Sequence, residues 1–344
     1  MRAPLTAAKA AAATLMALTL LSGCATTAGP RATARALDAI LAKSRPEADR
    51  KQDRYRHPVR TLLFFGIRPQ SRVLLVWPSS GYYTRIIAPL VRRRGRLYAG
   101  LIAPGHSAFL AARRARYRRL LASRPHLYNR VRVVTFPLDG GQVLPPGSVD
   151  MVLTFRDLHR WMALGVARQA FATIYRALAP GGVLGVVDNR GNPSVAQDPC
   201  ARNGYVRQDY AIRLIESAGF RLVATSEVNA NPRDTRNYPA GVWTLPPTYR
   251  LGRIGRARYA AIGESDRFTL KFIKPRAAAS RPARWRGGER APMRPRVNAS
   301  CSTTSVSGAH PHRAKRPVRR PPRPRRKSPV PASQRSPGTR APRR

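Results

Sequence analysis

Short uninterrupted apolar runs alternate with expected helices along the middle of the chain. Five runs have the length of strands: 73–77, 96–102, 131–136, 149–155 and 183–187. Continuous runs of this kind are typical of strands buried on both faces of a sheet. Helices are expected between them at 82–91, 106–123 and 163–178, the last followed by the stop signal Pro180-Gly181-Gly182. This alternation predicts a parallel sheet covered by helices on both faces.

The two ends of this region differ from its middle. Residues 36–41 and 48–66 are expected to form helices before the first strand. After a helix at 208–218, the runs 221–228 and 267–273 are separated by a long polar connection and are expected to form an antiparallel edge. The fold class is therefore predicted to be α/β: a Rossmann-like three-layer α/β/α sandwich with a mostly parallel seven-stranded sheet and an antiparallel edge strand. Ligands of such sheets bind beyond the carboxyl ends of the strands, which points to the loops after residues 77, 102, 136, 155 and 187.

The first 23 residues have the pattern of a secretory signal peptide. Arg2 and Lys9 precede an apolar run over 10–21, which is shorter than the ~20 residues needed to span a bilayer. The tetrad Leu-Ser-Gly-Cys at 21–24 resembles the bacterial lipobox. This resemblance implies cleavage before Cys24, lipid on that cysteine, a tether over 24–44, and a lipid-anchored protein on the periplasmic side of the cell envelope. The residue after the cysteine is Ala25 and not Asp. In the lipoprotein sorting rule of enteric-type bacteria, this favours the outer membrane.

Positive charge dominates the composition. The formal net charge is +48, and the segment 276–344 holds twenty Arg and Lys residues against Glu289 alone. A segment so rich in Arg and Pro buries too little apolar surface to offset its chain entropy, so it is predicted to be a disordered basic tail. Anionic envelope components are expected partners. Nucleic acid is not, because Trp285 is the tail's one aromatic residue and offers no series of stacking platforms. Translation of a shifted reading frame would equally explain this composition.

Three segments resemble class I S-adenosylmethionine-dependent methyltransferases. They are the first strand and turn at 73–84 (VLLVWPSSGYYT), the approach to the fourth strand at 146–153 (PGSVDMVL), and the turn before the fifth strand at 176–184 (RALAPGGVL). The span 45–275 is more closely similar to the predicted periplasmic methyltransferases of proteobacteria. This similarity rests on five segments: 55–58 (YRHP), 153–159 (LTFRDLH), 226–232 (SEVNANP), 241–247 (GVWTLPP) and 262–267 (IGESDR). The resemblance implies a methyltransferase-like domain over 45–275.

The resemblance implies S-adenosylmethionine as cofactor. The implied cofactor-binding residues are Trp77, Ser79, Ser80, Gly81, Tyr83, Asp139, Phe155 and Arg156. The chain departs from the periplasmic family at Leu75, where a glutamate is usual, and at Ser79 and Ser80, where two glycines are usual. The second strand ends at Ile102 without the carboxylate that would accept hydrogen bonds from the ribose. Asp139 would contact the adenine amino group, or it is an ordinary turn residue before Gly140.

The candidate catalytic residues follow the fourth and fifth strands. His159 is a candidate general base, because an imidazole titrates near neutral pH, and Asp157 and Asp188 are further candidates. The alternative is that His159 begins a helix capped by Asp157. Residues 264–267 (ESDR) are interpreted as a salt-bridged turn rather than a site. The sequence has no metal-ligand spacing, nucleophile elbow or phosphate-binding loop.

Two functional hypotheses follow. The first is a lipid-anchored S-adenosylmethionine-dependent methyltransferase of the cell envelope, acting on a small-molecule acceptor that the sequence does not identify. The second is a non-catalytic relative that has kept the sheet, lost the cofactor and serves as an envelope binding module for anionic partners, since fold does not fix function. Leu75, Ser79 and Ser80 motivate the second hypothesis.

Overall fold

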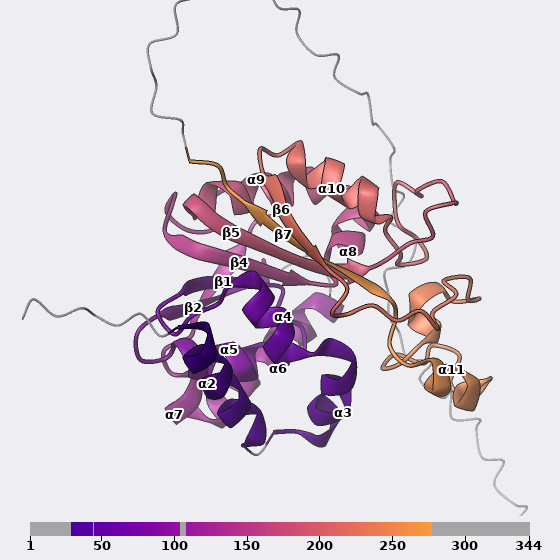
Figure 1. Cartoon of the computed structure of the whole chain (residues 1–344), viewed down its shortest axis with the longest axis horizontal. Coiled ribbons are helices and arrows are strands. Elements are labelled where there is room, and N and C mark those ends of the chain that lie inside the picture. Colours follow the sequence, from indigo (N-terminus) through magenta and orange to yellow (C-terminus); the bar gives the residue numbers. More distant parts are fainter. Residues whose placement is uncertain (1–28, 44, 104–107, 277–344) are drawn as a thin grey trace, which may run out of the picture. The chain divides into compact units, whose positions relative to one another are not determined.

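The computed structural model describes residues 29–43, 45–103 and 108–276 (Figure 1). The predicted signal peptide 1–23, the lipidation site Cys24 and residues 277–344 of the predicted basic tail lie outside the described residues. Those interpretations therefore remain predictions.

A seven-stranded sheet forms the centre of the fold. Its strands lie in the order β3-β2-β1-β4-β5-β7-β6, with β1 to β5 parallel. Strand β7 is antiparallel to both β5 and β6, so the predicted antiparallel pairing is found at this edge of the sheet. The strands are β1 (Arg72–Val76), β2 (Arg96–Ile102), β3 (Arg132–Phe136), β4 (Val149–Phe155), β5 (Leu178–Asn189), β6 (Arg221–Ser226) and β7 (Arg267–Ile273). The predicted Rossmann-like α/β fold is confirmed.

Helices cover both faces of the sheet (Figure 1). The helices are α2 (Pro30–Ala42), α3 (Glu47–Arg56), α4 (Pro58–Phe65), α5 (Thr84–Val91), α6 (Ala108–Ser123), α7 (Pro125–Tyr128), α8 (Leu158–Ala163), α9 (Ala167–Ala177), α10 (Gln208–Glu216), the 3-10 turn η1 (Gly241–Thr244) and α11 (Arg256–Ile262). Alternate residues of β1 enter different cores, because successive side chains of a strand point to opposite faces. Val73 and Leu75 pack with α2, α4 and α5, whereas Leu74 and Val76 pack with α8, α9 and α10.

The folded domain begins earlier than predicted. Residues 30–42, which were assigned to the tether 24–44, form helix α2. Leu37 and Thr33 of this helix are buried, and Leu37 belongs to the same core cluster as Leu62 and Ile86. The helix expected at 36–41 is therefore present and begins six residues earlier, and the tether interpretation is wrong for residues 30–42, because an apolar stripe among Ala and Arg residues is enough to pack the helix against α4 and α5.

Two predicted helices have other bounds in the structure, and one of them is divided into two. The helix expected at 48–66 is interrupted at His57, which has a φ of 37°. Pro58 follows it, and the residue before a proline is sterically disfavoured in the α conformation. The helix expected at 163–178 begins later, at Ala167 of α9, because Gly165, whose φ is 70°, follows the end of the short helix α8. Turn chemistry therefore overrode the helical spacing at both places.

The connection between β6 and β7 is more structured than its polar sequence indicated. It contains η1 and α11, and its residues Tyr238, Leu245 and Tyr259 form a small core with Tyr205 of the loop after β5. Asp234 accepts a hydrogen bond from the Tyr205 hydroxyl at 3.0 Å, which ties the connection to the loop after β5. This connection brings residues 264–267 to the carboxyl end of the parallel strands.

Candidate functional site

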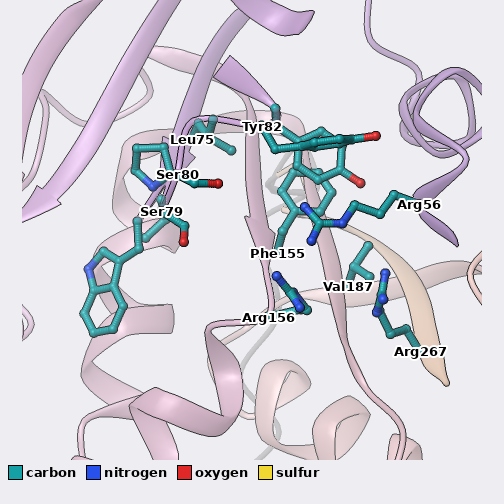
Figure 2. A pocket seen from close by; sticks show the side chains of 13 residues that line it. Arg56, Leu75, Ser79, Ser80, Tyr82, Phe155, Arg156, Val187 and Arg267 are labelled. Atoms are coloured by element: carbon teal, nitrogen blue, oxygen red, sulfur yellow. The ribbon is translucent and has the colours of Figure 1, made fainter. Parts of the chain in front are cut away.

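A pocket opens beyond the carboxyl ends of β1, β4 and β5 (Figure 2). The strand order reverses here, because the chain runs from β1 outward to β3 and then returns to place β4 on the other side of β1. Such a switch point is where open α/β sheets bind ligands. The pocket has an empty volume of about 500 Å³, open space at its mouth included. It is lined by Arg56, Leu75, Val76, Trp77, Pro78, Ser79, Ser80, Tyr82, Tyr83, Phe155, Arg156, Val187 and Arg267.

The turn after β1 forms one side of the pocket and has an unusual backbone. Trp77, Ser79 and Gly81 have φ angles of 44°, 49° and 84°. Only glycine adopts this region without strain, and an L-residue in it costs ~1–2 kcal/mol. At Gly81 a Cβ atom would lie 2.0 Å from Leu120 Cδ2, so any other residue would need both a left-handed backbone and a shift of the Leu120 side chain. Trp77 and Ser79 keep a turn shaped for glycines, and strain of this kind concentrates at functional sites.

Aromatic rings form the middle of the pocket. Tyr83 stacks on Phe155 with ring centroids 3.5 Å apart and ring planes at 12°. Tyr82 meets Tyr83 edge to face at 4.9 Å, and its hydroxyl donates a 2.6 Å hydrogen bond to Asp53 Oδ1. Burial raises the pKa of Tyr83 to about 12. The rings therefore give the pocket an uncharged, rigid floor.

An ion cluster closes the other side of the pocket. Arg56 donates to both carboxylate oxygens of Glu264, at 3.2 and 3.1 Å, and Arg267 also donates to Glu264 Oε2. Burial alone would raise the pKa of Glu264, but Arg267 and Arg56 outweigh it and lower this pKa to about 2. The predicted salt-bridged turn at 264–267 is thus present, and it also supplies the pocket with Arg267.

Arg156 follows β4 and has no comparable partner. Its φ is 64°, and its backbone N–H donates to the Val187 carbonyl at 2.7 Å. Among the described residues its guanidinium makes no hydrogen bond or ion pair. Burial lowers its pKa to about 9, with the charge of Arg56 acting in the same direction. The pocket therefore contains a partly desolvated cation held on a strained backbone.

The candidate catalytic residues His159 and Asp188 are brought together but do not line the pocket. His159 Nδ1 lies 2.8 Å from Asp188 Oδ1, and the His159 backbone N–H donates to Asp188 Oδ2 at 3.2 Å. Both side chains are buried, and the imidazole meets the Trp243 ring at a centroid distance of 6.1 Å. This arrangement joins α8 to β5.

Asp157 stands at the N-cap position of α8 but makes no capping hydrogen bond with its side chain. Its carboxylate accepts a 3.2 Å hydrogen bond from the Thr154 hydroxyl and lies 3.8 Å from Arg160 Nη1. Burial raises its pKa to about 7, against the opposing charge of Arg160. Asp157 is thus a buried acid next to the pocket residue Arg156 and is not itself part of the lining.

Six of the eight predicted cofactor residues meet at the pocket. They are Trp77, Ser79, Ser80, Tyr83, Phe155 and Arg156. Gly81 shapes the same turn without lining the pocket. Asp139 is exposed, lies outside the lining, and accepts a 2.8 Å hydrogen bond from the Gly141 N–H. The structure therefore gives Asp139 the geometry of an ordinary turn residue.

The end of β2 offers no acceptor for a ribose among the described residues. Its last residue is Ile102, whose carbonyl already accepts a hydrogen bond from Arg114 Nη1 at 2.9 Å. Residues 104–107 lie outside the described part of the chain. A buried donor does remain at the turn after β1: the indole Nε1 of Trp77 has no hydrogen-bond partner in the described residues.

Arg56 and Arg267 were not identified from the sequence as site residues. They lie 211 positions apart in the numbering of the chain, and both donate hydrogen bonds to Glu264. A signal was nevertheless present, because both belong to segments that carry the family resemblance, 55–58 and 262–267. The segments 55–58 and 262–267 thus each contribute one arginine to the lining of this pocket.

Comparison with known proteins gives a fold likeness alone. The sequence matches no protein-family model and no curated protein. A SAM-dependent methyltransferase from Aquifex aeolicus is 16% identical with a TM-score of 0.44, over 67% of this chain and 100% of that chain. The N-methyltransferase NodS from Bradyrhizobium japonicum, in complex with S-adenosyl-L-homocysteine, is 17% identical with a TM-score of 0.41, over 71% and 98%. The 1,6-didemethyltoxoflavin-N1-methyltransferase from Burkholderia thailandensis is 16% identical with a TM-score of 0.39, over 80% and 93%. The fold assignment rests on the strand order of the sheet itself.

Proposed function

We propose that this domain is a class I S-adenosylmethionine-dependent methyltransferase. One observation carries the proposal: the pocket at the switch point between β1 and β4 is lined by residues 77–80 of the turn after β1, within the segment that resembles the cofactor turn of that class. Left-handed backbone at Trp77, Ser79 and Gly81 makes this turn tight and strained, as is common at ligand-binding sites. The ligand-binding position expected for this fold, the pocket and the motif all lie at the carboxyl ends of the parallel strands.

The residues present fit the cofactor in part. The turn 77–81 and the Trp77 indole N–H would hold it by hydrogen bonds, and the stacked Tyr83 and Phe155 would exclude water. When bound, the cofactor supplies a methyl group activated on a positively charged sulfur. The protein's part is to align an acceptor with that methyl group, because positioning supplies much of the acceleration of such displacements. Leu75, which is 1% exposed, supplies no carboxylate.

Calorimetry of the full-length chain with S-adenosylmethionine and S-adenosylhomocysteine tests the proposal. We expect binding of both, and we expect the combined variant Leu75→Glu, Ser79→Gly and Ser80→Gly to bind about tenfold more tightly, which corresponds to ~1.4 kcal/mol. The new carboxylate would accept hydrogen bonds that Leu75 cannot, and the glycines relieve strain at Ser79. Val223→Glu is the control, since it adds the same charge at a 40% exposed position on β6 and should leave the affinity unchanged.

A second function is favoured by the absence of any carboxylate among the lining residues in the described part of the chain. In this alternative the domain is a non-catalytic envelope binding module for anionic partners. It predicts no heat with the unmodified chain at millimolar cofactor and measurable binding by the restored variant. Equal binding by the two forms would rule this alternative out.

The location of the protein is a separate proposal. We propose that lipid on Cys24 holds the mature chain to a membrane on the periplasmic side, with the outer membrane favoured by Ala25. In the described residues, none of the helices has the length and apolar character to cross a bilayer.

Membrane fractionation of the Cys24→Ala variant tests the anchor. Wild-type protein should stay with membranes when salt rises from about 0.1 to about 1 M, since lipid burial does not depend on the Debye length, which shortens from ~10 to ~3 Å. The variant should be an uncut precursor or a released species. A variant that matures to the wild-type mass and resists salt would contradict lipidation at Cys24.

A further inference from the structure

The pocket has an excess of positive charge that the protein does not neutralise. Arg56, Arg156 and Arg267 line it, and no carboxylate does so among the described residues. Glu264 lies behind the lining and is 1% exposed. Its two oxygens already accept three hydrogen bonds, two from Arg56 and one from Arg267. Both oxygens of this carboxylate are thus taken by two arginines, and among the described residues Glu264 acts on Arg156 through its charge alone, without a hydrogen bond or ion-pair contact.

Arg156 is the cation left over. In Figure 2 the guanidinium groups of Arg56, Arg156 and Arg267 lie toward one end of the pocket, away from Ser79 and Ser80. A further arginine, Arg160, follows on α8, and its charge is directed to Asp157. A partly buried charge is unfavourable unless it is paired, so a guanidinium kept unpaired on a left-handed backbone is suited to an anion from outside the chain.

The proposed cofactor does not solve this imbalance. S-adenosylmethionine carries a sulfonium and an ammonium group against one carboxylate, so its net charge is positive. Its entry would add positive charge to a pocket that already holds three arginines. An anion bound beside it would favour its binding, whereas S-adenosylhomocysteine, which lacks the sulfonium charge, would gain less. Arginine is also the side chain best shaped to bind carboxylate or phosphate oxygens in pairs.

We propose that the pocket recognises a methyl acceptor bearing a carboxylate or phosphate group, and that Arg156 forms the ion pair with that group at the end of the pocket bounded by Arg56 and Arg267. The assignment of the anion as acceptor rests on the proposed methyltransferase function. The anion site itself follows from the charges and contacts of the lining residues. Arg156 then determines specificity by selecting anionic molecules.

Inorganic phosphate is a suitable probe, with chloride at equal ionic strength as the baseline. At saturating phosphate the melting temperature of the full-length chain should rise by about 3 °C, because a ligand bound only by the folded state stabilises it. Arg156→Gln should lose most of this rise and, without phosphate, should melt no lower than wild type, since it removes an unpaired charge. Arg221→Gln is the matched charge control and should keep the rise. Arg221 is exposed at the start of β6, and the pocket lies at the other end of the strands, beyond their carboxyl ends.

Calorimetry in the same buffers tests the coupling to the cofactor. Phosphate should tighten S-adenosylmethionine binding by about fivefold, should tighten S-adenosylhomocysteine binding less, and should do neither in Arg156→Gln. An unchanged phosphate effect in Arg156→Gln would overturn the anion site. Phosphate that weakens both cofactor forms would overturn the acceptor assignment, because Arg156 would then hold the cofactor's own carboxylate. A phosphate effect that depends on Arg156 in a chain that binds neither cofactor form would uphold the anion site and refute the methyltransferase function.

Discussion

Substituting Gln for Glu264 is expected to lower the free energy of unfolding by about 3–5 kcal/mol, because it removes one partner of a buried ion cluster. The carboxylate is 1% exposed and is the shared partner of Arg56 and Arg267. Gln preserves its shape but not its charge, so the arginines around the pocket would face one another without compensation. Denaturant unfolding at neutral pH, analysed at constant slope, measures the difference.

Glu227→Gln is the control for this substitution. Glu227 pairs with Arg190, but its side chain is 62% exposed, and an exposed ion pair contributes ~0–1 kcal/mol. A loss at Glu264 that is no larger than the loss at Glu227 would show that the cluster does not stabilise the domain.

Acid should act on the same cluster. The pKa of Glu264 is about 2 in the folded protein, against an ordinary value of 4.5, so the unfolded chain binds more protons between these values. The stabilisation is complete above about pH 4.5 and is lost as the pH falls toward about 2. The Glu264→Gln variant should lose less stability over this window than the wild type.

Asp157→Asn is expected to act in the opposite direction and to raise the free energy of unfolding by about 1–3 kcal/mol at pH 8. Burial raises the pKa of Asp157 to about 7 from an ordinary 3.8, so the folded protein binds more protons than the unfolded chain between these values. Stability should therefore fall as the pH rises from about 4 to about 7. Asn removes the ionisation, and thermal melts from pH 4 to pH 8 should lose this component of the pH dependence.

Asp209→Asn is the control, because the pKa of Asp209 is shifted in the direction opposite to that of Asp157. Hydrogen bonds from Arg207 and Arg213 lower the pKa of Asp209 to about 2, so its ionised form is favoured by folding. Its substitution should not stabilise the protein at pH 8. If Asp157→Asn also fails to stabilise, the buried carboxylate is already compensated by Arg160 or is protonated at that pH.

The sheet could be predicted from the sequence because its signal is local. The strands at 149–155 and 267–273 have the expected bounds, since a short apolar run buried on both faces has few alternatives. Helix ends were less predictable. At His57 a positive φ ended a helix that the spacing of apolar residues would have continued, and at Gly165 a positive φ delayed the start of the helix expected at 163–178.

The same difference between local and long-range signals decides which residues of the candidate site could be predicted. The turn 77–81 and residues 155–156 follow strands directly, so the topology placed them at one pocket. Arg56 and Glu264 are 208 positions apart, and no local pattern indicates that they pair. The depth of His159 and Asp188 was also not predictable, because their burial is set by α8 and by the Trp243 ring that packs over the imidazole.

The docking of α2 onto the domain limits how far the protein can stand from a membrane. For a chain anchored at Cys24 as proposed, only residues 25–29 separate the lipid from the first turn of that helix. Fully extended, five residues reach roughly 17 Å, about half the thickness of a bilayer's hydrocarbon core. A linker of this length would keep the domain close to the membrane surface. Its working range would be a shallow layer beside the headgroups, where it would meet molecules that are embedded in the bilayer or pass close to its surface.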